Sequence, residues 1–230
     1  MRKIFLTLLQ FNQKKIMERQ ITTVVLDLDG TLVQSHKNIY EATIHSFEKL
    51  NINYNLPEEE FYKKIGHHFE DIFSDFGIIV NDFEKFIKVY KSVYFDYIAS
   101  SSLYPGVEKV LYELKARKFN ISLLTTKAQD QADRIIEHFH LSKYFDYIMG
   151  RRPGIPHKPA PDMLMKICDD LNSLPRQTIM VGDTELDILC GKNAGSITCG
   201  VTYGYRSSEE IENLKPDFVI NNFEEILKIL

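Results

Sequence analysis

Acidic, hydroxyl and basic side chains follow four separate apolar runs of this 230-residue sequence. Each of the four runs is short enough to be a buried strand. The polar segments that follow them are 27–31 (DLDGT), 125–127 (TTK), 157–162 (HKPAPD) and 182–187 (GDTELD). Ligands of doubly wound sheets bind beyond the carboxyl ends of the strands, so these segments should meet at one edge.

The carboxylates in these segments suit phosphoryl chemistry on a metal ion. Asp27 and Asp183 offer the hard oxygen ligands that Mg²⁺ prefers, alongside substrate phosphate. A carboxylate such as Asp27 can also attack phosphorus and form an aspartyl-phosphate. Asp29, two residues further on, should return to the same side and act as a general acid and base.

The other polar residues suit the binding of a phosphate group. Lys158 and Thr125 would hold the phosphoryl oxygens, with the lysine and the metal neutralising charge. Gly30 would let the backbone bend close to the phosphate and present free amides. The sequence therefore predicts a Mg²⁺-dependent enzyme that acts on a phosphate ester.

Strand and helix patterns alternate along most of the chain, as a sheet that positions these segments requires. Runs rich in apolar residues predict strands, and segments with helical spacing lie between them, so we expect an α/β fold with a doubly wound, mostly parallel sheet. The expected strands are 22–26, 121–124, 145–148, 178–181, 196–198 and 218–220.

One region breaks the alternation. Residues 34–102 contain only helical patterns and many Phe and Tyr residues, which we interpret as the core of an all-helical insertion. The predicted organisation is an N-terminal extension (1–20), a catalytic core (21–33 and 103–230) and a helical cap domain (34–102). We expect the extension to be a short helical or frayed segment rather than a signal peptide, with Met17 as an alternative start.

Composition argues against several classes of protein. Lys and Arg number 28 against 32 Asp and Glu, for a net charge of −4, so we expect no nucleic-acid partner. Three cysteines without CxxC spacing favour neither a disulfide scaffold nor a zinc site, and indicate a cytoplasmic protein. No apolar stretch approaches the ~20 residues of a membrane span.

The four polar segments together resemble the signatures of the haloacid dehalogenase-like hydrolase superfamily, in the subgroup with a small helical cap. Residues 27–32, 124–127, 158–162 and 181–187 carry the resemblance, which extends from Thr22 to about Leu230. It implies a Rossmann-like core, with Asp27 as nucleophile and metal ligand and Asp29 as acid and base, its carbonyl oxygen on Mg²⁺. It further implies that Asp183 binds the metal and Asp187 its water shell.

Within that family, the sequence is most similar to phosphoglycolate phosphatases and related pyrophosphatases, which share segments 103–107 and 200–205. It departs from them at Thr126, where asparagine is common, and at His67 and His68 of the cap. We expect one of these two histidines to face solvent and the other to face the cleft between cap and core. Thr126, His67 and Arg151 are candidates for substrate binding.

The leading hypothesis is a phosphatase that hydrolyses a small phosphorylated metabolite as a monomer or homodimer. A sugar phosphomutase or an inorganic pyrophosphatase on the same site is the main alternative. A binding protein with an idle site is disfavoured, because every residue of the catalytic set is present.

Overall fold

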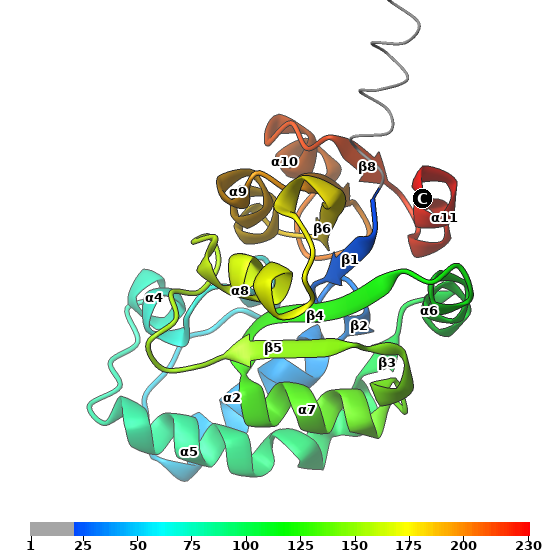
Figure 1. Ribbon diagram of the computed structural model, residues 1–230. Helices are drawn as coiled ribbons and strands as arrows, with labels where there is room; N and C mark the ends of the chain where they lie inside the picture. Colours follow the sequence, from blue (N-terminus) through cyan, green and yellow to red (C-terminus); the bar gives the residue numbers. More distant parts are fainter. Residues whose placement is uncertain (1–20) are drawn as a thin grey trace, which may run out of the picture.

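The computed structural model describes residues 21–230 (Figure 1). The extension expected at 1–20, and the alternative start at Met17, lie outside the described residues. In the part of the chain described, no helix is long and apolar enough to cross a bilayer.

A six-stranded sheet in the order β5-β4-β1-β6-β7-β8 forms the centre of the fold, and every pairing in it is parallel. Its strands are β1 (Thr23–Leu26), β4 (Asn120–Ala128), β5 (Tyr147–Arg151), β6 (Thr178–Gly182), β7 (Ile197–Val201) and β8 (Phe218–Ile220). The expected α/β class and parallel sheet are confirmed. The third strand begins later than expected, because Phe145 and Asp146 follow the short 3₁₀ turn Ser142–Tyr144.

Helices cover both faces of this sheet, so β1 is buried on both sides. Val24 and Leu26 pack with the helices α6 (Val107–Ala116) and α7 (Gln129–His138), whereas Val25 packs on the opposite face with α8 (Asp162–Asp170) and α9 (Glu185–Ala194). This alternation follows from the two-residue period of a strand. The other core helices are α10 (Ser208–Asn213) and α11 (Ile226–Ile229), with 3₁₀ turns at Pro175–Gln177 and Phe223–Glu225.

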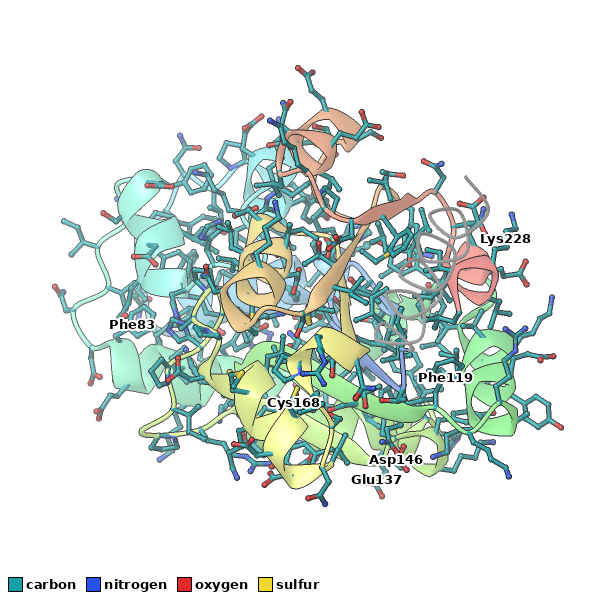
Figure 2. All side chains as sticks on the ribbon, turned by 45° about the horizontal axis from the view of Figure 1, so that its top comes forward. Phe83, Phe119, Glu137, Asp146, Cys168 and Lys228 are labelled. Carbon is teal, nitrogen blue, oxygen red and sulfur yellow. The ribbon has the colours of Figure 1, made fainter. Side chains whose placement is uncertain are left out.

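The insertion between β1 and the rest of the sheet is helical, as expected. It contains α2 (His36–Lys49), α3 (Glu58–Tyr62), α4 (Phe69–Asp75), α5 (Phe83–Val93) and the 3₁₀ helix η1 (Tyr94–Ser100). Its aromatic residues form the predicted core: the ring of Phe73 lies 4.9 Å from Phe47 and 5.0 Å from Phe86. Figure 2 shows Phe83 of this insertion on the side of the molecule away from Lys228 of α11.

Two very short strands join the insertion to the sheet. β2 (Val33–Gln34) and β3 (Ser102–Leu103) pair antiparallel where the chain leaves the core and returns to it. The expectation of no strand between 34 and 102 was therefore wrong at both ends of that range. Two residues are too few to show an alternating pattern in the sequence.

The packing of the aromatic core predicts how substitutions in the insertion change the free energy of unfolding. Phe86 is fully buried and contacts several rings, so Phe86→Ala should lower the free energy of unfolding by roughly 3–5 kcal/mol. Ile79, in the same insertion, is 77% exposed, so Ile79→Ala should change the free energy of unfolding by less than about 0.5 kcal/mol. Urea unfolding measures both; equal effects would contradict the packing described.

Candidate active site

Residues from four strand ends line one cavity at the carboxyl edge of the sheet. Asp27 follows β1, Thr125 lies near the end of β4, and Thr184 follows β6. Lys158, from the loop between β5 and α8, completes the same wall. The predicted convergence of these sequence segments is confirmed in the geometry.

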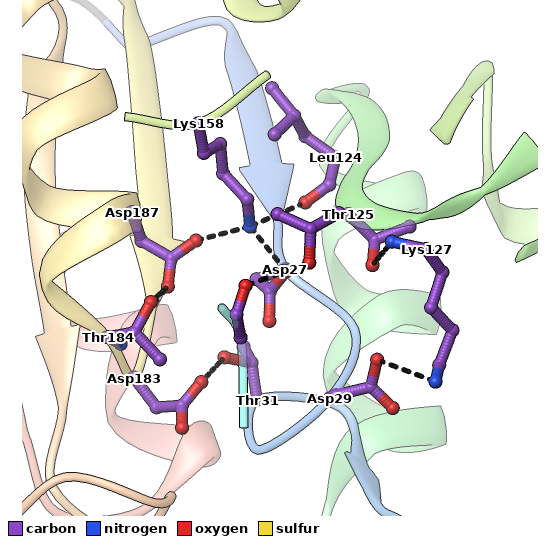
Figure 3. Close-up of polar contacts among 12 residues, drawn as sticks. Asp27, Asp29, Thr31, Leu124, Thr125, Lys127, Lys158, Asp183, Thr184 and Asp187 are labelled. Carbon is purple, nitrogen blue, oxygen red and sulfur yellow. Dashed lines mark hydrogen bonds and ion pairs between the residues drawn. The ribbon is translucent and has the colours of Figure 1, made fainter. Parts of the chain in front are cut away.

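Lys158 is the centre of the polar network in this cavity (Figure 3). Its side chain is 3% exposed, and its Nζ lies 2.5 Å from Asp27 Oδ1 and 2.5 Å from Asp187 Oδ1. Nζ also donates to the carbonyl oxygen of Leu124 at 3.1 Å. Burial opposes the ammonium charge, but Asp187 and Asp27 outweigh it and raise the pKa of Lys158.

Asp183 is held by groups from two distant parts of the chain. Thr31 Oγ1 donates to its Oδ1 at 3.2 Å, and the Tyr205 backbone N–H donates to its Oδ2 at 2.8 Å. Gly30 leaves room for this carboxylate, because a methyl group there would lie 2.2 Å from Oδ2. Gly30 also has φ +86°, which favours glycine.

Asp187 has a structural role at the start of α9. Its Oδ2 accepts from the Thr184 backbone N–H at 3.0 Å and from Thr184 Oγ1 at 2.6 Å, within a capping box. The other carboxylate oxygen contacts Lys158. The local sequence TELD therefore both begins the helix and fixes a carboxylate next to Lys158.

Three carboxylates form a pocket with the donor set of a divalent cation. Oxygens of Asp27, Asp183 and Asp187 all lie within 4.8 Å of one another, and all three residues are buried. Burial, with repulsion from Asp187, raises the pKa of Asp183 to about 7. Burial also raises the pKa of Asp27, with Lys158 opposing and the other two carboxylates adding to the shift. One ammonium thus faces three buried carboxylates, and a hard divalent cation fits this site.

Asp29 lines the cavity with Asp27, but its carboxylate lies outside that group of three. Lys127 Nζ lies 3.3 Å from its Oδ2, and Ser35 Oγ donates a short hydrogen bond to its Oδ1. The Lys127 ammonium also lies 4.7 Å from the centre of the Tyr94 ring. Lys127 and Ser35 therefore orient Asp29, which the sequence analysis did not foresee, although Lys127 is in the second polar segment.

The candidates for substrate binding lie in different surroundings. Thr125 is buried and its Oγ1 accepts from the Lys127 backbone N–H at 3.2 Å. Thr126 Oγ1 donates to the Gly66 carbonyl oxygen at 3.3 Å and so ties the core to the insertion. Arg151, at the end of β5, lines the cavity and contacts His68 Nδ1 through Nη1 at 2.8 Å.

Both adjacent histidines of the insertion contact the core, through different partners. His67 Nε2 lies 2.6 Å from Glu185 Oε1, whereas His68 Nε2 makes a short hydrogen bond with His157 Nε2. The two rings point different ways, as expected. His67 is exposed, as expected of one of the two, and it also contacts Glu185 at the start of α9.

Arg206 completes the contact on the His67 side. Its side chain is 6% exposed, and its Nε and Nη2 donate to Glu185 at 2.8 and 3.1 Å. Its Nη1 donates to the Ile65 carbonyl oxygen at 3.2 Å. Burial raises the pKa of Glu185, but His67 and Arg206 reverse the direction and lower it. No local sequence motif predicts these contacts of Arg206, because its partners are distant in the sequence.

The model of the haloacid dehalogenase-like hydrolase family matches residues 24–201, which include Asp27, Asp29, Thr125, Lys158, Asp183 and Asp187. The chain belongs to this family. It is 30% identical over 214 residues to the pyrophosphatase PpaX of Bacillus mycoides, covering 92% of this chain and 97% of that protein.

Solved structures agree with this assignment. A predicted phosphoglycolate phosphatase of Haemophilus somnus superposes with a TM-score of 0.79 at 27% identity, covering 91% of this chain and 98% of that one. A haloacid dehalogenase-like hydrolase of Streptococcus pneumoniae superposes with a TM-score of 0.81 at 26% identity, covering the same shares. The Rossmann-like core with a helical cap is thus the fold of this chain.

If the three buried carboxylates bind Mg²⁺, the ion should stabilise the protein. Mg²⁺ at about 100 times its dissociation constant should stabilise the protein by ~2.7 kcal/mol, which corresponds to a rise in Tm of roughly 5–10 °C. Asp183→Asn should remove most of this rise, whereas Asp170→Asn, on the exposed face of α8, should keep it. Calorimetry with and without MgCl₂ measures the shift. A full shift in Asp183→Asn would place the ion elsewhere.

Proposed function

We propose that this protein is a Mg²⁺-dependent phosphatase that hydrolyses a phosphate monoester of a small metabolite through an aspartyl-phosphate on Asp27. The observation that carries this proposal is the position of Asp27. Its carboxylate lies at the end of the central strand, paired with buried Lys158 and next to Asp183, in a cavity shared with Asp29.

Asp27 attacks the phosphorus atom in the proposed reaction. Lys158 orients Asp27 and favours its ionised form against the effect of burial, and its ammonium faces the negative charge that spreads over the phosphoryl oxygens. The Thr125 hydroxyl adds a hydrogen-bond donor on the same side. The Gly30 N–H does not, because it donates to the Val33 carbonyl oxygen at 2.9 Å, so the free amide expected at Gly30 is absent. These groups are fixed before substrate arrives, which is what electrostatic stabilisation of a transition state requires.

Asp27 and Asp183 would hold the metal ion, with the Asp29 carbonyl oxygen as a further ligand and Asp187 at its water shell. Bound Mg²⁺ supplies positive charge against the phosphoryl oxygens. Asp187 already has two other partners, Lys158 and Thr184, and these favour the outer role.

Asp29 transfers the proton in both halves of the reaction. It protonates the leaving oxygen when Asp27 attacks, and it then accepts a proton from the water that hydrolyses the aspartyl-phosphate. Its contacts with Lys127 and Ser35 hold the carboxylate in place for both steps.

A pyrophosphatase is the second candidate function, because the Bacillus mycoides relative is named as one. The same nucleophile and metal site would serve that reaction, with inorganic phosphate as the leaving group. A sugar phosphomutase would use the same residues, but it would return the phosphoryl group to the sugar. Phosphate release from a panel of sugar phosphates, phosphoglycolate, nucleotides and pyrophosphate separates these functions, and an isomerised sugar phosphate without free phosphate would indicate a mutase.

A cytoplasmic location, and a monomeric or homodimeric state, remain part of the proposal. Cys168, Cys190 and Cys199 are all free and buried, which suits a reducing compartment.

Asp27→Asn should abolish turnover, because it replaces the attacking oxygen with an amide, and the rate should fall by a factor of at least about 10³. Its fold should persist, since Lys158 retains Asp187 as a partner. Phosphate release with Mg²⁺ and circular dichroism measure the two effects. A folded variant with near-normal rates would refute the covalent route.

Asp29→Asn should slow the hydrolysis of alkyl phosphates by about 10²–10⁴-fold. The loss should be smaller for aryl phosphates, because their leaving groups need little protonation. The ratio of kcat/KM for the two classes of ester measures this difference. Equal losses for alkyl and aryl esters would rule out the acid role of Asp29.

A further inference from the structure

The cavity above Asp27 is much larger than a phosphate group needs. Its volume is about 430 Å³, which would hold roughly fourteen water molecules at ~30 Å³ each. It extends from Asp27 and Lys158 at the edge of the sheet to α4 and α5 of the insertion. A bound phosphoryl group would occupy only its inner end, so the remaining volume faces the leaving group.

Much of the wall that faces this remaining volume is apolar. It is formed by side chains of α4, α5 and the first turn of α9, namely Phe69, Ile72, Phe83, Ile87, Tyr90 and Leu186. Phe69 packs edge-on against Tyr90, with 4.8 Å between the ring centres, so the aromatic part of this wall is fixed by its own packing. Such a wall favours an uncharged body over water or an anion.

The basic side chains that line the cavity already have partners among the described residues. Lys91 lies 2.7 Å from Asp130, and Lys127 and Lys158 are paired with the aspartates described above. Arg151 donates to His68, and burial together with His157 and Arg151 lowers the pKa of that ring. Among the described residues, Arg151 therefore has a hydrogen-bond partner but no paired carboxylate. His67 is paired with Glu185.

The remaining charged groups of the outer wall are acidic. Glu70 of α4 and Glu84 of α5 both line the cavity and are exposed. A second phosphate, or a carboxylate on the leaving group, would therefore meet apolar rings, two carboxylates and one guanidinium, that of Arg151. One guanidinium does not outweigh two carboxylates, so desolvating such an anion here is costly.

We propose that the substrates of this enzyme are phosphate monoesters whose leaving alcohol carries an uncharged aromatic or aliphatic body, in preference to pyrophosphate and to phosphates of hydroxy acids. This proposal rests on the phosphatase function proposed above. The phosphoryl group binds at Asp27 and Lys158, and the body of the alcohol lies against Phe69, Phe83 and Ile87.

The test compares three substrates with the full chain and Mg²⁺: 2-phenylethyl phosphate, phosphoglycolate and pyrophosphate. The first two are alkyl esters, so their comparison does not depend on an activated aryl leaving group. We expect kcat/KM for 2-phenylethyl phosphate to exceed both others by at least about tenfold, as differential burial of a hydrocarbon body allows. Equal or higher kcat/KM for phosphoglycolate or pyrophosphate overturns the proposal.

A matched pair of variants locates the preference in the cavity. Ile87→Lys introduces a cation into the apolar wall, whereas Ile79→Lys changes a residue of the same insertion that is 77% exposed. Ile87→Lys should reduce the preference for 2-phenylethyl phosphate over pyrophosphate by at least about tenfold, and Ile79→Lys should leave it unchanged. Equal changes for all substrates in a folded Ile87→Lys protein would overturn the assignment of this wall.

The outcomes also separate this proposal from the proposed function. If no ester in the panel releases phosphate, the phosphatase function itself fails. If phosphate is released with pyrophosphate as the best substrate, the phosphatase chemistry stands and the apolar leaving group is wrong. The wild-type comparison keeps its meaning even if Ile87→Lys does not fold.

Discussion

One buried ammonium group among three buried carboxylates is the constraint on which the rest of the site depends. Lys158 contacts both Asp27 and Asp187. A carboxylate oxygen of Asp183 lies within 4.8 Å of oxygens of these two aspartates. Taking these charges out of water is costly unless they are paired, and one lysine cannot balance three aspartates. The arrangement is therefore suited to binding a cation, and with it the anionic phosphate.

The segment 65–68 of the insertion connects the cap to several of the loops that carry this charge network. Gly66 accepts a hydrogen bond from Thr126, His67 contacts Glu185 next to the acidic loop, and His68 contacts His157 next to Lys158. The position of the cap over the cavity is thus set by the same strand ends that hold the residues proposed to react. This coupling explains why these residues and those proposed to face the leaving group share one cavity.

The sequence predicted the parts of this site that follow from local pattern. Buried apolar runs located the strands, and the residues after them, from Asp27 to Asp183, had to meet because the strands are parallel. Local patterns could not predict contacts between residues that are distant in the sequence. Arg206 finds Ile65 only through the fold, and Tyr205 holds Asp183 through a backbone N–H that any residue type could supply.

The same limit applies to residues that were predicted with a single role. Gly30 was expected to approach the phosphate, but its lack of a side chain is already required by Asp183. Thr126 was expected to bind substrate, and in the structure its hydroxyl donates to the insertion. Residue type and spacing indicate that a position has a functional or structural role. The contact that defines this role depends on tertiary structure.

Rapid acid quenching during turnover, followed by mass spectrometry of the peptide that contains Asp27, would show whether Asp27 is the nucleophile. We expect a phosphoryl group on Asp27 that forms and decays at least as fast as kcat. A phosphoryl group on another residue, or phosphate released faster than the labelled peptide decays, would contradict it.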